Sequence, residues 1–149
     1  MDIQNDDSCI LCGKNNQHGL KLEFTLDYEN NKAYTFVNVG KIFNGFTGIV
    51  HGGIICALLD EAGFYACRTL DIITVTMSLN TKFKKPVPIN TKLYLEGEVV
   101  QRRSRSVITN SKLMLASVGG VSVNGVSVDG GSIDGEVLAS ATGEFFIKK

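Results

Sequence analysis

Hydrophobic and polar residues alternate along most of this chain, and one long stretch departs from the alternation. A period of two is typical of strands with one buried face, and it recurs in residues 20–36, 72–83, 92–101, 106–116 and 136–147. Within the first stretch, polar residues 28–32 predict a turn and therefore a hairpin. The exception is 54–70, where apolar residues cover most of a helical circumference, so this helix should be enclosed by other structure.

The order of these elements predicts an α+β fold. Strands come first, then the one helix, then four long strands with no second helix. We therefore expect an antiparallel β-sheet curled around one long central α-helix. The length of 149 residues suits a single domain spanning 1–149.

Residues 117–135 stand apart from this pattern. They contain VSVNG, VSVDG and GSIDG, which are near-copies at a period of five. Units of five residues are too short to bury a core of their own, and Asx-Gly pairs favour tight turns. We interpret 117–135 as a Gly-rich insertion that forms a hairpin tip or a loop between the last two strands, with a binding role as the alternative.

The overall charge excludes some partners. Fifteen basic and fifteen acidic residues cancel, so no net charge favours nucleic acid or an anionic membrane. No apolar run approaches the roughly 18 residues that a membrane helix requires, and the acidic start is unlike a secretory signal. We expect a cytoplasmic protein with no nucleic-acid or membrane partner.

Two adjacent acids, Asp60 and Glu61, lie in the middle of the apolar helix. No Lys or Arg stands three or four positions from Asp60 to pair with it. An unpaired carboxylate that leaves water costs several kcal/mol or has its pKa raised, and such groups cluster at functional sites. The pattern therefore indicates that Asp60 is a working carboxylate, with a solvated surface acid as the alternative. For Glu61, a supporting or solvated role is favoured.

The head of the helix carries His51-Gly52-Gly53. Amides in a first helical turn have no partner within the helix, and the helix dipole makes this end positive, so the two glycines leave donors that could hold a polarised carbonyl. Gly52 and Asp60 are eight residues apart, which is about 12 Å along a helix. One carbonyl cannot contact both. If the two act together, antiparallel helices of two chains related by a two-fold axis must meet, with two equivalent sites per dimer.

Three segments resemble hotdog-fold thioesterases of the phenylacetic-acid-pathway and 4-hydroxybenzoyl-CoA thioesterase II type. They are GIVHGGIICALLDEA (48–62), TMSLNTKFKKPVP (76–88) and CILCGKNNQHGLKLEF (9–24). The specific element is the His-Gly-Gly followed by an acid nine residues after the histidine. The resemblance covers nearly the whole chain except the repeats, and it implies a hotdog fold that hydrolyses an acyl-CoA thioester.

The resemblance also implies roles for individual residues. Asp60 would be the catalytic carboxylate, as base or as nucleophile; the Gly52 amide would polarise the thioester carbonyl, with His51 positioning nearby, and Thr76 would help to orient the water. Many members have Asn or Gln six residues before the histidine, where this chain has Gly45 and places Asn44 one residue further back. The substrate-binding set would include Gly53 and Glu61. No cofactor or metal is implied, and the assembly would be a homodimer or a dimer of dimers.

A second group of candidate residues is basic. The resemblance places the nucleotide of coenzyme A on the outer surface of such proteins, and Arg side chains match phosphate geometry. The candidates are Lys84, Lys85, Arg102, Arg103, Ser104 and Arg105. The alternative is a set of solvated turns.

Cys9 and Cys12 are spaced as in zinc and redox motifs. Zinc takes four ligands, yet only His18 lies nearby and no second Cys pair follows. A redox motif would need a βαβ setting that the pattern does not predict. We therefore interpret residues 9–19 as a packed N-terminal lasso and predict no metal.

The favoured function is hydrolysis of an acyl-CoA to a free acid and CoA. Two alternatives share the fold: a hydratase or dehydratase, and a non-catalytic acyl-CoA-binding regulator. The known hydratases of this fold use a different arrangement of histidine and acid.

Overall fold

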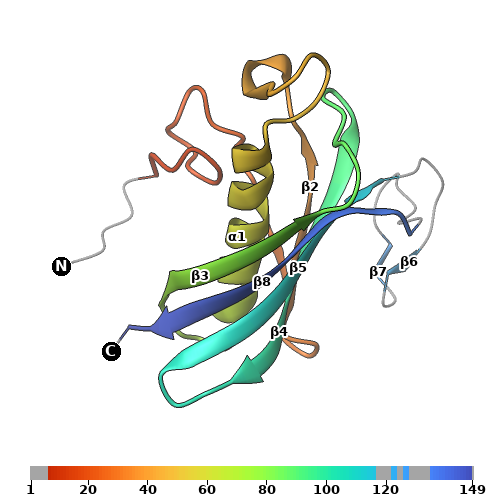
Figure 1. Cartoon of the computed structure of the whole chain (residues 1–149). Helices are drawn as coiled ribbons and strands as arrows, with labels where there is room; N and C mark the ends of the chain where they lie inside the picture. The colour runs from red at the N-terminus through yellow and green to blue at the C-terminus, as the bar shows by residue number, and fades with distance from the viewer. Residues whose placement is uncertain (1–6, 117–121, 124–125, 128–134, 149) are drawn as a thin grey trace.

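A six-stranded antiparallel sheet packs against one long helix in the part of the chain that the computed structural model describes, residues 7–116, 122–123, 126–127 and 135–148 (Figure 1). The helix is α1 (Gly52–Arg68), preceded by the 3₁₀ turn η1 (Lys41–Phe43). The strands are β1 (Thr25–Asp27), β2 (Lys32–Asn38), β3 (Thr74–Phe83), β4 (Lys92–Arg102), β5 (Ser106–Leu115) and β8 (Val137–Ile147), in the order β1-β2-β4-β5-β8-β3. This arrangement confirms the predicted α+β fold.

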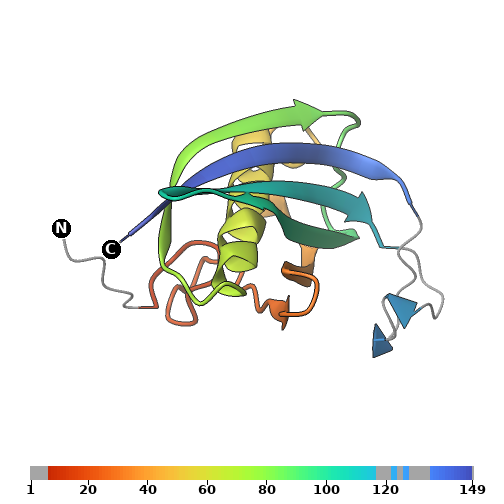
Figure 2. The same cartoon turned by 90° about the horizontal axis from the view of Figure 1, so that it is seen from below.

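The sheet curves over α1, and the N-terminal segment lies on the other side of the helix (Figure 2). The helix approaches the sheet closely because glycines face it. A methyl group at Gly97 of β4 would lie 2.1 Å from the Ala62 carbonyl oxygen, and one at Gly63 would lie 2.7 Å from the Thr109 hydroxyl oxygen. Leu58 and Leu59 fill this interface and are fully buried. The helix is therefore fixed in position relative to the strands.

The N-terminal segment folds back on itself rather than joining the sheet early. The N–H groups of Leu20 and Leu22 donate to the carbonyls of Ile10 and Leu11, and the Phe24 ring stacks on Tyr65 of α1 at 4.4 Å. The alternation of residues 20–24 therefore reflects pairing with residues 10–11. The prediction that the first strand begins at residue 20 was wrong, since β1 begins at Thr25.

Two further predictions concern the start of the helix and residues 117–135. The helix begins at Gly52 and not at residue 54, because His51 caps its first turn. Of the predicted insertion 117–135, the structure describes the two short paired strands β6 (Ser122–Val123) and β7 (Val126–Ser127), together with Gly135; the rest lies outside the described residues. Among those residues, no helix has the length and apolarity to cross a membrane.

Strand β3 forms one edge of the sheet, and several of its apolar side chains are exposed. Val75 is 37% exposed, Met77 58% and Phe83 57%. An edge strand of ten residues with apolar side chains offers unpaired backbone groups to another chain. The fold thus leaves one long strand available for pairing.

Candidate functional site

Asp60 faces the start of β3. The Thr76 hydroxyl donates to Asp60 Oδ1 at 2.8 Å, whereas Asp60 Oδ2 has no hydrogen-bond partner within the described residues. The side chain is half-buried, and no Lys or Arg among those residues forms an ion pair with it. One carboxylate oxygen is therefore fixed and the other is available.

Burial controls the ionisation of Asp60. Removal from water raises the pKa of its carboxyl, and the hydrogen bond from Thr76 lowers it by less. A carboxylate with a raised pKa is a better proton acceptor than a solvated one. The site thus holds a carboxylate suited to taking a proton from water.

The head of α1 provides one free donor. His51 is the N-cap, and its Nδ1 accepts from the Gly53 N–H at 2.9 Å. This corrects the expectation that both glycine amides are uncovered, because a side chain two residues away already binds one of them. The Gly52 N–H has no acceptor among the described residues, and Gly52 is exposed. Of the two glycine amides, the one free to bind an acceptor in the described chain is therefore that of Gly52.

Helix α1 runs antiparallel to β3, so Gly52 and Asp60 lie near opposite ends of that strand. A methyl group at Gly52 would lie 3.7 Å from the ring of Phe83, the last residue of β3. Asp60 contacts Thr76, which lies near the first residue of β3. Gly52 and Asp60 therefore cannot reach the same carbonyl within one chain, which agrees with their spacing of about 12 Å. The sequence did not indicate Phe83 as part of the site.

Asn44 lies beside the helix head. Its backbone pairs with Val50, and the neighbouring Phe43 carbonyl accepts from the His51 N–H at 2.9 Å. The side-chain oxygen of Asn44 is buried and has no partner among the described residues. The loop thus brings Asn44 to the end of the molecule that carries Gly52.

The basic candidates form two separate groups in one chain. Lys84 and Lys85 follow β3 at the end near Gly52, and Lys85 pairs with Glu136. The 102–105 turn lies at the opposite end, where the Arg105 carbonyl accepts from the Ile147 N–H and Ile147 pairs with Thr74. A hollow of about 350 Å³ is lined by Lys84 and by residues of β3, β4, β5 and β8, and it includes neither Gly52 nor Asp60.

Within the 102–105 turn, the arginines differ. Arg103 donates to Glu144 at 3.2 Å and to Gln101 at 3.3 Å. Arg102 and Arg105 are exposed and have no ion-pair partner among the described residues, and Ser104 between them is exposed as well. Arg102 and Arg105 are therefore the arginines free to bind an anion.

The Glu61 side chain faces the N-terminal segment, whereas Asp60 contacts Thr76 of β3. Burial raises the pKa of its carboxyl, and a hydrogen bond with Cys12 lowers it by less. The two adjacent acids thus belong to different surroundings. The contact with Cys12 was not predicted, because nothing in the sequence relates residues so far apart.

Comparisons with known proteins found similar sequences and similar folds. A model of the thioesterase superfamily matches residues 47–116, the segment that runs from the helix head through β5. This segment of the chain is similar to the thioesterase superfamily.

Three similar proteins illustrate the relationship. The acyl-coenzyme A thioesterase THEM4 of Rattus norvegicus is 26% identical over 97 residues, which are 63% of this chain and 41% of that protein. The thioesterase superfamily protein RHA08564 has a TM-score of 0.74 at 20% identity, covering 95% of this chain and 61% of that one. The smu.793 protein of Streptococcus mutans, solved with acetyl-CoA, has a TM-score of 0.67 at 15% identity, covering 85% and 88%. The matches span 41–43% of the length of the curated relatives.

Replacing Asp60 by Asn should reveal how much the burial of this carboxylate lowers the stability of the folded chain. The folded-state pKa of Asp60 is raised, so the folded chain holds the proton more tightly than the unfolded chain. Stability therefore falls as pH rises through the window between the two pKa values. Asp60→Asn removes this penalty and keeps an oxygen for Thr76. We expect Asp60→Asn to melt at a higher temperature than the wild type at pH 7, with the difference vanishing below the ordinary aspartate pKa of about 4.

Thermal melts of both proteins across this pH range measure the effect. Asp71→Asn, which removes an exposed charge just beyond α1, controls for the change in net charge. An Asp60→Asn protein less stable than the wild type at pH 7 would contradict the account.

Proposed function

We propose that this chain is an acyl-CoA thioesterase that converts acyl-S-CoA and water to a free acid and CoA. The observation that carries the proposal is the half-buried Asp60, which is held by Thr76 and has no cationic partner among the described residues. The match of residues 47–116 to the thioesterase superfamily and the likeness to a protein solved with acetyl-CoA support the substrate class.

In the proposed reaction, the free oxygen of Asp60 takes a proton from a water molecule. The water oxygen bonds to the thioester carbon, and the Gly52 N–H stabilises the negative charge that develops on the carbonyl oxygen. When the intermediate collapses, the C–S bond breaks and the proton passes to the departing CoA sulfur. Thr76 fixes the other oxygen of the carboxylate, so that the free one faces the water.

The direct test is Asp60→Asn, which keeps the shape and removes the base. Turnover should fall by about 10²-fold or more, the range expected for a lost general base, while the acyl-CoA still binds. Release of free thiol from acyl-CoA measures turnover, with hydration of crotonyl-CoA followed in parallel. Wild-type turnover in Asp60→Asn would reject the assignment, and a larger loss in Glu61→Gln would transfer the role to Glu61.

We propose further that each site is shared by two chains joined along β3. An exposed edge of this length with apolar side chains favours pairing with a second copy. Antiparallel pairing of β3 with its symmetry mate would continue the sheet across the dimer. The pairing would also cover the exposed Val75 and Met77.

The register of such a pairing would complete the site. β3 has a bulge between Thr76 and Ser78, so Met77 has no partner across the ladder. With the same bulge at the free edge, a two-fold axis through Asn80 would place Thr76 of one chain opposite Phe83 of the other. The helix head beside Phe83 would then meet the carboxylate beside Thr76, twice per dimer.

Mixing two inactive variants tests the shared site. Gly52→Pro removes the free N–H yet suits the fold, because Gly52 is the first helical residue and His51 has the extended ψ of 136° that precedes proline well. Each homodimer, Gly52→Pro or Asp60→Asn, should be inactive. After subunit exchange, a mixed dimer holds one intact site, so activity should recover to about a quarter of wild type.

Gly52→Ala keeps the N–H and should lose far less activity than Gly52→Pro, which separates the amide from the side chain. Mass spectrometry of the intact dimers would verify that mixed dimers form. Verified mixed dimers without activity would reject the shared site.

The same pairing would join the two basic groups. The end of β3 that carries Lys84 and Lys85 in one chain would meet the end that carries Arg102 and Arg105 in the other. We propose that this combined surface binds the phosphates of coenzyme A. Arg103, engaged by Glu144, would orient the turn.

Replacing Arg102 and Arg105 together by Ala should raise KM for acyl-CoA by about tenfold or more, as expected for lost hydrogen bonds to a charged group, and should change kcat less. The matched substrate is a pantetheine thioester, which lacks the nucleotide and should show a smaller rise in KM. Equal rises for both substrates would show that the two arginines do not contact the nucleotide.

A further inference from the structure

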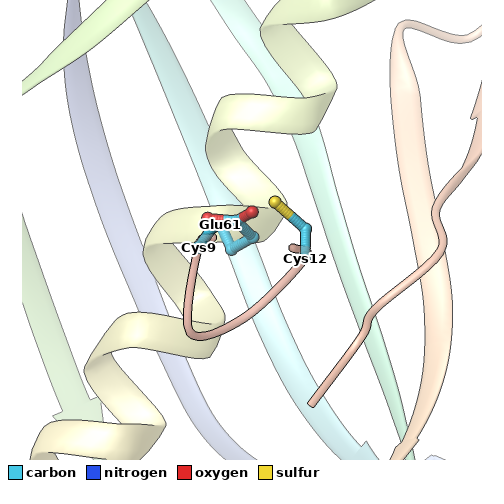
Figure 3. A group of neighbouring side chains, drawn as sticks. All are labelled: Cys9, Cys12 and Glu61. Atoms are coloured by element: carbon cyan, nitrogen blue, oxygen red, sulfur yellow. The ribbon is translucent and has the colours of Figure 1, made fainter. Parts of the chain in front are cut away.

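Three ligand-type side chains meet on the face of α1 that bears the N-terminal segment. The sulfurs of Cys9 and Cys12 and a carboxylate oxygen of Glu61 all lie within 4.8 Å of one another, and each residue is half-buried. Figure 3 shows the 9–12 turn lying over the middle of the helix, with the Cys12 sulfur directed toward the Glu61 carboxylate. A turn and a helix distant in sequence thus supply one cluster.

The turn that carries the cysteines has a fixed shape. The Leu11 N–H donates to the Cys9 sulfur at 3.3 Å, and the Gly13 N–H donates to the Cys9 carbonyl at 3.0 Å. A methyl group at Gly13 would lie 2.4 Å from the Cys9 nitrogen and the Asp7 carbonyl oxygen, so only glycine fits there. The backbone therefore holds both sulfurs ready for a common ligand.

The charges in the cluster are uncompensated. Each of the three groups is anionic when it loses its proton, and no Lys or Arg among the described residues forms an ion pair with Glu61. Burial, followed by the hydrogen bond with Glu61, raises the pKa of Cys12 to about 12. Cys12 therefore keeps its proton when no cation is bound. A divalent cation binds the deprotonated ligands, so it would displace protons from the cluster and neutralise the charges that form.

We propose that Cys9, Cys12 and Glu61 form a binding site for a divalent metal ion of the zinc class. Two thiolates and a carboxylate are a zinc-type donor set, and thiolates select against magnesium and calcium. The three residues leave a fourth tetrahedral position for a water molecule. The ion would attach the 9–24 segment to α1 at the residue that follows Asp60. This function is structural and is independent of the proposed hydrolysis.

The test is a cobalt titration of the full-length chain after reduction and chelation. The expected result is thiolate-to-cobalt charge-transfer absorption that saturates at about one ion per chain and is abolished by zinc. Cys9→Ser and Cys12→Ser should each weaken zinc binding by at least about tenfold in competition with a chromophoric chelator, and Cys56→Ser, on the opposite part of α1 beside Thr81, should not. Absence of the absorption in the reduced wild type would overturn the proposal.

Glu61→Gln separates this site from a simple pair of thiols. It keeps both sulfurs, so the cobalt absorption should persist while zinc affinity falls by about tenfold, the scale of a lost interaction at a metal site. Unchanged affinity would show that Glu61 is not a ligand. Hydrogen exchange should also slow in residues 9–24 when zinc is added to the wild type, and not in Glu61→Gln at the same zinc concentration. A Cys9–Cys12 disulfide in a chain that takes up no metal when reduced would identify a redox pair instead.

Discussion

The arrangement of this molecule depends on one unfavourable interaction, the removal of the Asp60 carboxylate from water without a cation beside it. A fold that minimised its own free energy would place an apolar residue there, because burial raises the pKa of this carboxyl and nothing in the described chain neutralises it. Gly63 and Gly97 let α1 approach the sheet closely, and from this helix Asp60 contacts Thr76 of β3.

A second unfavourable feature lies along the same strand. β3 leaves its backbone edge unpaired and exposes Val75, Met77 and Phe83. Natural sheets usually protect such edges with charged residues, proline or a covering element. Among the ten residues of β3, Lys82 is the one charged residue, and none is proline. In the proposed dimer, pairing along β3 would relieve this exposure and bring a helix head to each buried carboxylate. One association would thus resolve both features.

Local pattern was enough to predict the main architecture. The period-two alternation located β2, β3, β4, β5 and β8, and the apolar run located α1, because each of these elements is governed by its own burial pattern. The errors came from contacts distant in sequence. Residues 20–24 alternate as a strand does, yet they pair with Ile10 and Leu11. The Gly53 amide is covered by His51, a residue type that seldom caps helices.

The same distinction applies to the site. Asp60 could be selected from the sequence because an unpaired acid in an apolar helix is anomalous by itself. The division of the basic residues between two ends of the sheet could not be seen, since it follows from the strand order that sets β3 beside β8. Phe83 was missed for a similar reason: its contact with Gly52 exists only because α1 crosses β3 in the antiparallel direction.

The pair Asp60-Glu61 shows how one helix can carry two acids with separate tasks. Adjacent residues point about 100° apart on a helix, so Asp60 faces Thr76 on the sheet side while Glu61 faces Cys12 in the N-terminal segment. The charge on Asp60 nevertheless raises the pKa of Glu61. The proposed cation would bind Glu61 on the side of the helix that bears the N-terminal segment, whereas Asp60 is held by Thr76 of β3. One helix would thus position a structural metal ligand and a base in adjacent residues, because the two side chains point to different parts of the fold.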